Sequence, residues 1–347
     1  MFKVAFIWRV PPQLRKHFKL ELSELEVAHR CCLAFAESTS EDDLLALARD
    51  ATVVVGWRPP EKLLREAKRL VLFQNPGVGV QHLVPMFRRH PEITLCNCHG
   101  NTYFTAQHAL ALLLSLTNKV IPHHNWMSAG RWRTGDEDAK SIPLRERTVG
   151  ILGFGHLGQD FARFIRGFSV KVLAYQRRSL RGTPEKRDLI GEAGIVDGIM
   201  AREAGDSLDA FLDLIDTLVI TLPLTDETRG VIGSHELSLL GPEGLLVNVG
   251  RGPVVDEKSL YDSLDKGAIA GAALDVWYEY DPEPTSDGKS YPSNYPFHLL
   301  NNVVLSPHRG ASPMDDIARW NNVIENIKRA AAGRRDFIGV VNVDAGY

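Results

Sequence analysis

The chain has little of what marks a disulfide scaffold, a zinc protein or a membrane protein. It holds four cysteines in 347 residues. Neither the adjacent pair Cys31 and Cys32 nor the pair Cys96 and Cys98 has the spacing of a zinc or redox motif. We therefore expect reduced thiols and no metal site. No apolar run reaches the length that spans a bilayer, so we expect a cytoplasmic protein without membrane contact.

A surplus of charge of one sign is also lacking. The 40 Lys and Arg residues nearly balance the 43 Asp and Glu residues, and the formal net charge is −3. The charges are interspersed, so the sequence carries no electrostatic footprint for nucleic acid or for an anionic membrane. The opening segment Met1–Trp8 is too short for the apolar part of a signal peptide and predicts a first strand.

What the sequence does contain is enough apolar side chain for two cores, since 44% of its 347 residues are hydrophobic. Predicted strands and helices alternate before residue 100 and again after Arg147, which is the pattern of two α/β domains. We expect two doubly wound parallel sheets, of Rossmann or flavodoxin type, with a cleft between them. The predicted boundaries are 1–119 with 309–347 for a substrate domain and 120–308 for a dinucleotide-binding domain.

Three further segments are interpreted as follows. Residues 101–127 predict one long helix that bridges the domains and that Pro122 bends or ends. Ser312 is the predicted N-cap of a closing helix, which runs through Ala331 and returns to the first domain. The charged segment 179–207 is expected to be an insertion that carries a short helix and no chemistry.

A glycine-rich turn in the middle of the chain predicts a dinucleotide site. The apolar run Val149–Leu152 predicts a strand, and an amphipathic segment follows the turn. The first glycine allows a sharp turn, the second lets backbone amides approach a pyrophosphate, and the third lets the helix press on the sheet. Unpaired N–H groups and the helix dipole favour an anion at the helix N-terminus. The residues expected to bind the cofactor here are Gly153, Phe154, Gly155, His156, Leu157 and Gly158.

The end of the next predicted strand favours NADPH over NADH. NAD sites commonly place an Asp or Glu about 20 residues beyond the glycines, where it holds the ribose 2′-hydroxyl. Gln176 occupies that place, and Arg177 and Arg178 follow it. A carboxylate would repel a 2′-phosphate, whereas guanidinium groups match it. We expect NADP as the preferred cofactor and NAD as the second choice; the alternative is that both arginines only solvate a loop.

Two side chains that follow predicted strands suit the reduction of a 2-oxo acid. Arg251 follows the strand 245–248 in a tight turn, and His308 follows the strand 303–305. A guanidinium binds a carboxylate and a histidine donates a proton, while a nicotinamide supplies a hydride. Each side chain also has a structural interpretation, as a surface ion-pair partner or as part of a hydrogen-bonding turn. Because the carboxyl ends of parallel strands meet at one edge, we expect both in a catalytic site.

Five ordered motifs resemble those of the D-isomer-specific 2-hydroxyacid dehydrogenases, and the resemblance covers nearly the whole chain. It extends to residues 77–80, similar to the family's carboxylate-binding loop, and to residues 106–110, similar to its bridging helix. The five motifs are Gly153-x-Gly155-x-x-Gly158, Thr221-Leu-Pro-Leu-Thr225 with Asp226-Glu-Thr, Asn248-x-x-Arg251-Gly252-x-x-Val-Asp256, Gly271-Ala-Ala-Leu-Asp275-Val and Ser306-Pro-His308.

The resemblance implies a role for each matching position. Backbone amides of Val78 and Gly79 hold the substrate carboxylate. Arg251 binds the carboxylate and the carbonyl oxygen, and His308 protonates that oxygen to give a D-2-hydroxy acid. Asp275 contacts the nicotinamide side. The partner is then a small 2-oxo or 2-hydroxy acid, and a homodimer is implied. Further cofactor contacts are implied at Leu222, Pro223, Thr228, Val249, Gly250, Arg251 and His308.

One position departs from the family in a way that bears on the chemistry. The family usually has a glutamate five residues after the aspartate, where it pairs with the histidine and raises the histidine's pKa. Here residue 280 is tyrosine, flanked by Glu279 and Asp281. In an extended segment both carboxylates point to the opposite face, so either one serves His308 only if the backbone slips by one residue. The other option is a hydrogen bond from Tyr280 to His308.

Three alternatives stay open. A neutral residue at position 280 also suits formate-dehydrogenase-like hydride abstraction, which needs no proton relay. Some relatives of the family are non-catalytic corepressors that sense dinucleotides. Arg58, just after the predicted strand 52–55, either binds a second anionic group or a polar tail of the substrate, or pairs on the surface. Turnover of a 2-oxo acid separates the enzyme from the sensor.

Overall fold

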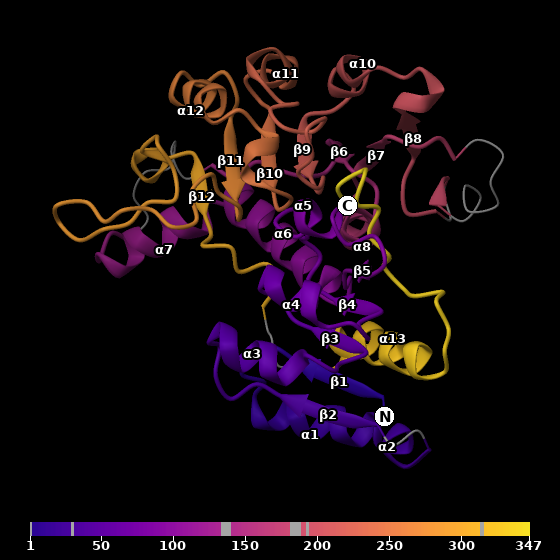
Figure 1. Cartoon of the computed structure of the whole chain (residues 1–347). Helices are drawn as coiled ribbons and strands as arrows, with labels where there is room; N and C mark the ends of the chain where they lie inside the picture. The colour runs from indigo at the N-terminus through magenta and orange to yellow at the C-terminus, as the bar shows by residue number, and fades with distance from the viewer. Residues whose placement is uncertain (1, 29–30, 133–139, 181–188, 192–193, 313–315) are drawn as a thin grey trace. The chain divides into compact units, whose positions relative to one another are not determined.

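The computed structural model describes residues 2–347 except 29–30, 133–139, 181–188, 192–193 and 313–315. It divides into two compact units. The first unit comprises Met1–Asn101 with Pro313–Tyr347, and the second unit comprises Thr102–Ser312. Each unit is a parallel sheet with helices on both faces (Figure 1). The predicted fold class of two doubly wound α/β sheets is confirmed.

The first unit has five parallel strands in the order β2-β1-β3-β4-β5, which is the flavodoxin-like order. One face is covered by α1 (Pro12–Glu21) and α13 (Asn321–Ala331), where Phe6, Phe18 and Trp320 form a buried aromatic cluster. The other face is covered by α3 (Glu41–Ala48), α4 (Glu61–Glu66) and α5 (Val84–Phe87). The remaining elements are β1 (Lys3–Phe6), β2 (Cys32–Phe35), β3 (Val53–Val55), β4 (Leu72–Gln74), β5 (Thr94–Cys96), α2 (Ser23–Ala28) and η5 (Ala318–Trp320).

The second unit has seven parallel strands in the order β12-β11-β10-β9-β6-β7-β8. This is the Rossmann order with one further strand, and the order of the strands reverses between β6 and β9. The strands are β6 (Thr148–Leu152), β7 (Lys171–Gln176), β8 (Gly198–Ala201), β9 (Thr217–Ile220), β10 (Leu245–Asn248), β11 (Gly271–Leu274) and β12 (Val303–Leu305).

Helices cover both faces of the seven-stranded sheet, so its central strands are apolar throughout. The helices α6 (Thr102–Thr117) and α8 (His156–Ile165) pack on one face. The helices α10 (Leu208–Leu212), α11 (Ser234–Leu240) and α12 (Glu257–Asp265) pack on the other (Figure 1). Every residue of β9, β10 and β11 is buried, as expected for a parallel sheet covered on both faces.

The units divide the chain at positions that differ from the predicted domain boundaries of 119/120 and 308/309. The second unit begins at Thr102, so α6 belongs with the glycine-rich turn. The reason is packing: α6 lies along α8, and its Leu112, Leu113 and Leu116 share one buried core with Phe161 of α8. An amphipathic helix belongs to the body that buries its apolar face. The C-terminal helix α13 belongs to the first unit, as predicted.

The predicted long helix 101–127 is two helices, α6 and α7 (Val120–Ser128). The break lies at Lys119, whose φ of +54° is left-handed and cannot continue a right-handed helix. Pro122 lies in the first turn of α7, where a missing N–H costs no helical hydrogen bond, so the prediction that it bends or ends the helix was wrong. The predicted closing-helix start at 313–315 lies outside the described residues, and the described helix begins at Asn321 after η5.

The segment 179–207 contributes to the sheet, which the sequence interpretation missed. Its β8 pairs in parallel with β7, from Leu173 opposite Gly198 to Gln176 opposite Ala201. The turn after it is fixed by Asp206, whose carboxylate accepts from the N–H of Ala201 at 2.7 Å. The sequence interpretation also missed strand β2.

None of the helices in the described ranges combines the length and the apolar character that a membrane crossing needs.

The α6–α8 core predicts a specific stability loss. Phe161→Ala removes a fully buried ring and should lower the free energy of unfolding by about 3–5 kcal/mol. Phe168→Ala is the matched control, because Phe168 is 36% exposed and should cost much less. Urea unfolding followed by far-UV circular dichroism measures both. Equal losses for the two variants would contradict this assignment of the core.

Candidate active site

The glycine-rich turn adopts the geometry that its sequence predicts. Gly153 follows β6 with φ +98°, a left-handed conformation that favours glycine. A Cβ on Gly158 would lie 2.4 Å from the carbonyl oxygen of Gly153, so only glycine lets α8 approach the turn this closely. Thr221, just after β9, donates its hydroxyl to the same carbonyl oxygen.

Gly155 leaves room for a ligand at the start of α8. It is the N-cap residue of the helix, no side chain caps the helix there, and a Cβ built on Gly155 would meet no atom within 4 Å. The first N–H groups of a helix have no intrahelical acceptor, and the helix dipole favours an anion at this end. The residues present therefore fit the pyrophosphate of a dinucleotide, with Phe154, His156 and Leu157 on the same turn.

The loops after β9 and β10 meet this turn. A Cβ on Gly153 would lie 3.0 Å from Leu222 Cδ2, and a Cβ on Gly250 would lie 2.7 Å from the carbonyl oxygen of Leu222. The hydroxyl of Thr228 donates to the carbonyl oxygen of Pro223 at 2.7 Å, which closes the loop after β9. The structure thus brings together the ends of β6, β9 and β10, which carry the predicted cofactor residues Leu222, Pro223, Thr228, Val249 and Gly250.

The end of β7 carries the residues predicted to select the cofactor. Gln176 is the last residue of the strand, and its side-chain amide donates to the carbonyl oxygen of Arg178 at 2.7 Å. Arg177 is half-buried and Arg178 is exposed. No carboxylate occupies position 176, so the repulsion that such a group exerts on a 2′-phosphate is absent from this position.

Arg251 is presented by a turn that the buried Asn248 organises. The side-chain amide of Asn248 donates to the carbonyl oxygen of Arg251 at 3.0 Å, and its oxygen accepts from the N–H of Gly250 at 3.1 Å. The Arg251 guanidinium donates to the carbonyl oxygen of Gly250 at 2.6 Å. Burial lowers the pKa of Arg251, and the nearby Tyr280 opposes that shift in part. A partly desolvated guanidinium is a strong ligand for a carboxylate or a carbonyl oxygen.

Asp275 directly follows β11 as a buried carboxylate and holds the turn that carries His308. It accepts from the hydroxyl of Ser306 at 2.5 Å and from the backbone N–H groups of Arg309 at 2.8 Å and Gly310 at 2.9 Å. Burial alone would raise its pKa, but contacts with His108, Ser306 and the two N–H groups outweigh burial, and the pKa of Asp275 is lowered. Both oxygens are therefore engaged by the protein, and the contact with the nicotinamide side that the resemblance implies stays a prediction.

His308 adopts an unusual backbone conformation in this turn. Its φ is +55°, in the left-handed region that few residues other than glycine adopt. Partial desolvation lowers the pKa of the imidazole, the positive charge of Arg251 lowers it further, and Asp275 raises it in part. Arg251 and His308 thus act on each other electrostatically, as expected for two groups of one site.

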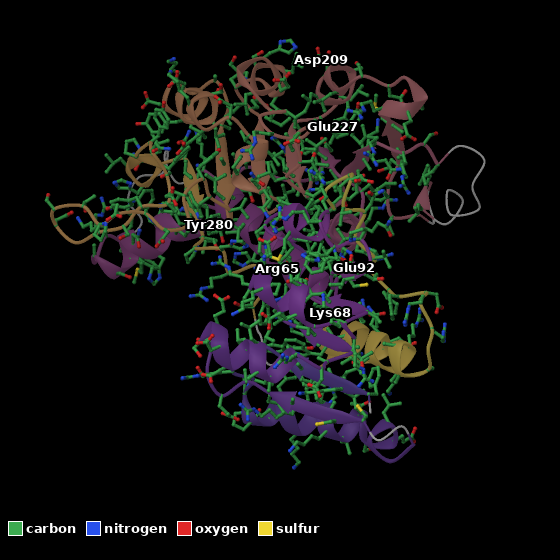
Figure 2. All side chains as sticks on the ribbon, in the orientation of Figure 1. Arg65, Lys68, Glu92, Asp209, Glu227 and Tyr280 are labelled. Atoms are coloured by element: carbon green, nitrogen blue, oxygen red, sulfur yellow. The ribbon has the colours of Figure 1, made fainter. Side chains whose placement is uncertain are left out.

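Tyr280 is the residue that the structure places beside the imidazole. The rings of Tyr280 and His308 lie edge to face with centroids 5.4 Å apart. The tyrosine is 57% exposed and lies on the segment that leaves β11 (Figure 2). Its hydroxyl accepts a long hydrogen bond of 3.4 Å from the N–H of Trp277. The contact with His308 is therefore between rings, and the hydroxyl bonds elsewhere.

Neither flanking carboxylate takes the place of the family glutamate. The N–H groups of Tyr278 and Glu279 both donate to the carbonyl oxygen of Pro292, so the segment turns and is not an extended strand. The carboxylate of Glu279 accepts from the N–H of Asp281 at 2.9 Å, and both side chains are exposed. The charged groups that shift the pKa of His308 are Arg251 and Asp275, and neither of the two flanking carboxylates is among them.

The predicted carboxylate loop belongs to the first unit. Asn75 donates its side-chain amide to the carbonyl oxygens of Gly77 at 2.7 Å and Gly79 at 3.3 Å, and Asn97 donates to that of Val78 at 3.2 Å. In a trans peptide the N–H points away from the preceding carbonyl, so the N–H groups of Val78 and Gly79 face away from these anchors. No hydrogen bond within the described residues uses these two N–H groups.

Arg58 follows Trp57 in the loop after β3. The carbonyl oxygen of Trp57 lies 2.7 Å from His82 Nε2, which fixes the loop, while the side chain of Arg58 is exposed. Its assignment to the substrate stays a prediction.

The sequence interpretation gave no chemical role to two residues near His308, which are His108 and Ser306. The pattern Ala106-Gln-His108 had been interpreted only as part of a helix.

Comparison with known proteins decides the family. The sequence model described as D-isomer specific 2-hydroxyacid dehydrogenase, NAD binding domain, matches residues 110–310. The chain belongs to this family. The chain is 33% identical over 303 residues to the glyoxylate reductase of Aeropyrum pernix, with 84% of each chain covered.

One further relative is longer than this chain, and two solved structures resemble it in fold. The chain is 32% identical over 274 residues to the D-3-phosphoglycerate dehydrogenase of Archaeoglobus fulgidus, covering 78% of this chain and 47% of that one. It therefore spans about half the length of that relative. An NADPH-dependent glyoxylate/hydroxypyruvate reductase from Sinorhizobium meliloti, solved with NADP and malonate, has a TM-score of 0.71 at 25% identity, covering 99% and 98% of the two chains. An acyclic imino acid reductase, solved with NADPH and D-Arg, shares the fold with a TM-score of 0.76 at 20% identity, covering 98% of this chain and all of that one.

The residues at the end of β7 predict a measurable cofactor preference. The double variant Arg177→Ala/Arg178→Ala should raise the Kd for NADPH by about tenfold or more, because charge-assisted hydrogen bonds to a phosphate contribute about 1.5–3 kcal/mol. The Kd for NADH should change little. Fluorescence titration of the two reduced cofactors measures both, with Arg202→Ala as an exposed control. Equal weakening for both cofactors would contradict the 2′-phosphate assignment.

Proposed function

We propose that the protein reduces a 2-oxo acid to a D-2-hydroxy acid, with NADPH preferred over NADH. The observation that carries the proposal is the grouping of Arg251 and His308 on loops that follow β10 and β12, at the edge of the sheet where the glycine-rich turn lies. The family membership and the glyoxylate reductases among the relatives support this reaction class. The predicted homodimer stays a prediction.

The glycine-rich turn and the start of α8 would hold the cofactor's pyrophosphate, and Arg177 and Arg178 its 2′-phosphate. When bound, the reduced nicotinamide supplies the hydride that reaches C2 of the substrate. The N–H groups of Val78 and Gly79 would donate to the substrate carboxylate, since no hydrogen bond among the described residues uses them and the carbonyls of Gly77 and Val78 are anchored.

Arg251 would bind the substrate's carbonyl oxygen and stabilise the negative charge that develops there. Its partial burial strengthens that interaction, because fewer water molecules compete for the guanidinium. His308 would donate the proton to the same oxygen. Arg251 lowers the pKa of His308, which makes the imidazolium a stronger acid but leaves less of it protonated near neutral pH.

Reduction of a 2-imino acid to an amino acid is a second candidate reaction, and the surroundings of His308 favour it. No carboxylate that would favour the protonated form takes the place of the family glutamate beside His308 in the described residues. The iminium form of a 2-imino acid already carries its proton, so hydride transfer to C2 gives the amine without any proton from the enzyme. Solvent then protonates the amine. A neutral imidazole suits this substrate better than an imidazolium, since it avoids repulsion between two cations.

A substrate panel tests the proposal. Glyoxylate, pyruvate, hydroxypyruvate and larger 2-oxo acids are assayed with NADPH and NADH, each with and without ammonium. We expect oxidation of NADPH with at least one 2-oxo acid in the absence of ammonium. Turnover only with ammonium would support the imine reaction instead. Binding of NADPH without turnover on the whole panel would contradict both reactions and favour a dinucleotide sensor.

Two substitutions test the assigned roles on the substrate that is turned over. Arg251→Ala should lower kcat/KM by about 10²-fold or more, because it removes the charge that stabilises the oxyanion. His308→Ala should lower kcat by about 10²- to 10⁴-fold, because it removes the proton donor. Stopped-flow measurement of NADPH oxidation gives both values. Near-native rates in either variant would contradict the assigned role.

The lowered pKa of His308 predicts the pH dependence of reduction. Reduction needs the protonated imidazole, so kcat/KM should fall as pH rises through a pKa that lies below the ordinary value of 6.5. Tyr280→Glu places a carboxylate beside the imidazole, and it should move this fall to higher pH by about one unit or more. Tyr280→Gln, which adds no charge, is the matched control. Equal shifts for the two variants would show that the effect is not electrostatic.

A further inference from the structure

A histidine on α6 contacts the turn that carries His308. The Nε2 atom of His108 lies 2.8 Å from the hydroxyl of Ser306 and 3.3 Å from Oδ1 of Asp275. The side chain of His108 is 28% exposed and that of Asp275 is 2% exposed. All of these residues belong to the second unit, so the contact is internal to one compact body.

The hydrogen-bond pattern fixes which atom of His108 carries the proton. Ser306 has one hydroxyl proton and donates it to Asp275 Oδ1 at 2.5 Å. Its oxygen can then only accept from His108 Nε2, so Nε2 must carry a hydrogen. His108 therefore acts as a donor to Ser306 and, at longer range, to the carboxylate. The order of donation is His108 to Ser306 to Asp275.

Asp275 in turn fixes the backbone on both sides of His308. It holds the N–H groups of Arg309 and Gly310, while the indole N–H of Trp277 donates to the carbonyl oxygen of Ser306 at 2.8 Å. A left-handed residue persists when its surroundings over-determine it. The turn is also tightly packed: a Cβ on Gly310 would lie 2.8 Å from Asp275 Oδ2 and 3.5 Å from His108 Cδ2.

We propose that His108 is a positioning residue for His308, acting through Ser306 and Asp275 on the turn Ser306–Gly310. It touches no reacting atom; its donated hydrogen bond orients the carboxylate that holds the turn in place. This inference rests on the proposed function for its catalytic consequence, but its structural consequence does not need turnover. A displacement of about 1 Å in a catalytic group can cost about 10²-fold in rate.

Three variants separate positioning from packing. His108→Leu removes the donor, and His108→Gln keeps an N–H group at nearly the same reach. His235→Leu is the matched control, since His235 is an exposed histidine on α11 that pairs with Asp209 instead. We expect kcat to fall about 10- to 100-fold in His108→Leu, with the KM for NADPH little changed. The melting temperature should fall as well, because the buried carboxylate of Asp275 loses a donor. His108→Gln should retain most of the activity, and His235→Leu should be unaffected.

Hydrogen exchange measured by mass spectrometry gives a second readout on the same proteins. Peptides that contain Arg309 and Gly310 should exchange faster in His108→Leu than in the original protein, and His108→Gln should restore their protection. If the protein turns over no substrate, the proposed function is wrong. The exchange difference would still decide whether His108 fixes the turn. Equal exchange in His108→Leu and His235→Leu, or faster exchange without loss of kcat in an active enzyme, would overturn the proposal.

Ser306→Ala is a variant that tests the relay if His108→Leu does not fold. Because His108 acts largely through Ser306, the double variant Ser306→Ala/His108→Ala should be little worse than Ser306→Ala alone, although His108→Ala alone removes the donor and should lower kcat. The measured quantity is kcat together with exchange of the same peptides. Independent, additive losses would show that the two residues act separately and would overturn the relay.

Discussion

The buried carboxylate of Asp275 is the constraint on which the rest of the candidate site depends. A charge taken out of water is costly unless several donors replace the water. Here the donors are the hydroxyl of Ser306, two backbone N–H groups and His108, and together they lower the carboxylate's pKa against the effect of burial. The same bonds fix the turn around His308. One interaction therefore keeps a buried charge stable and holds His308 in a strained, left-handed backbone conformation.

The position of this carboxylate follows from the topology of the sheet. All strand pairs in the second unit are parallel, so β6, β9, β10, β11 and β12 end at the same edge. Loops from several strands then meet although they are far apart in sequence, as the contacts among Gly153, Leu222 and Gly250 show. Ligand sites of doubly wound sheets lie at such edges, next to the point where the strand order reverses. Here that point lies between β6 and β9, beside the glycine-rich turn.

Much of this arrangement could be predicted from the sequence because it depends on local rules. Gly153 needs a left-handed conformation and Gly158 needs close packing, and both constraints act within a few residues. Strands β9, β10 and β11 are short apolar runs that only a sheet covered on both faces buries. Arg251 and His308 follow such strands directly, so the sequence places them at the correct edge.

The features that sequence reasoning missed depend on contacts distant in the chain. The unit to which α6 belongs is decided by its packing on α8, and a helical period says nothing of the partner. The role of His108 depends on residues about 170 to 200 positions away. The expectation for Glu279 and Asp281 assumed an extended segment, but hydrogen bonds to Pro292 make it turn. The donors that engage Asp275 come from α6 and from the turn after β12, so the sequence alone did not show them.

Two turns, one held by Asp275 and one by Asn248, are expected to aim His308 and Arg251 at the same substrate oxygen. A crystal structure of the protein with reduced cofactor and oxamate, an unreactive analogue of a 2-oxo acid, tests it most directly. We expect the oxamate carbonyl oxygen within hydrogen-bond distance of both side chains, with Asp275 still accepting from the N–H groups of Arg309 and Gly310. Oxamate bound away from Arg251 and His308, or a turn no longer bonded to Asp275, would contradict it.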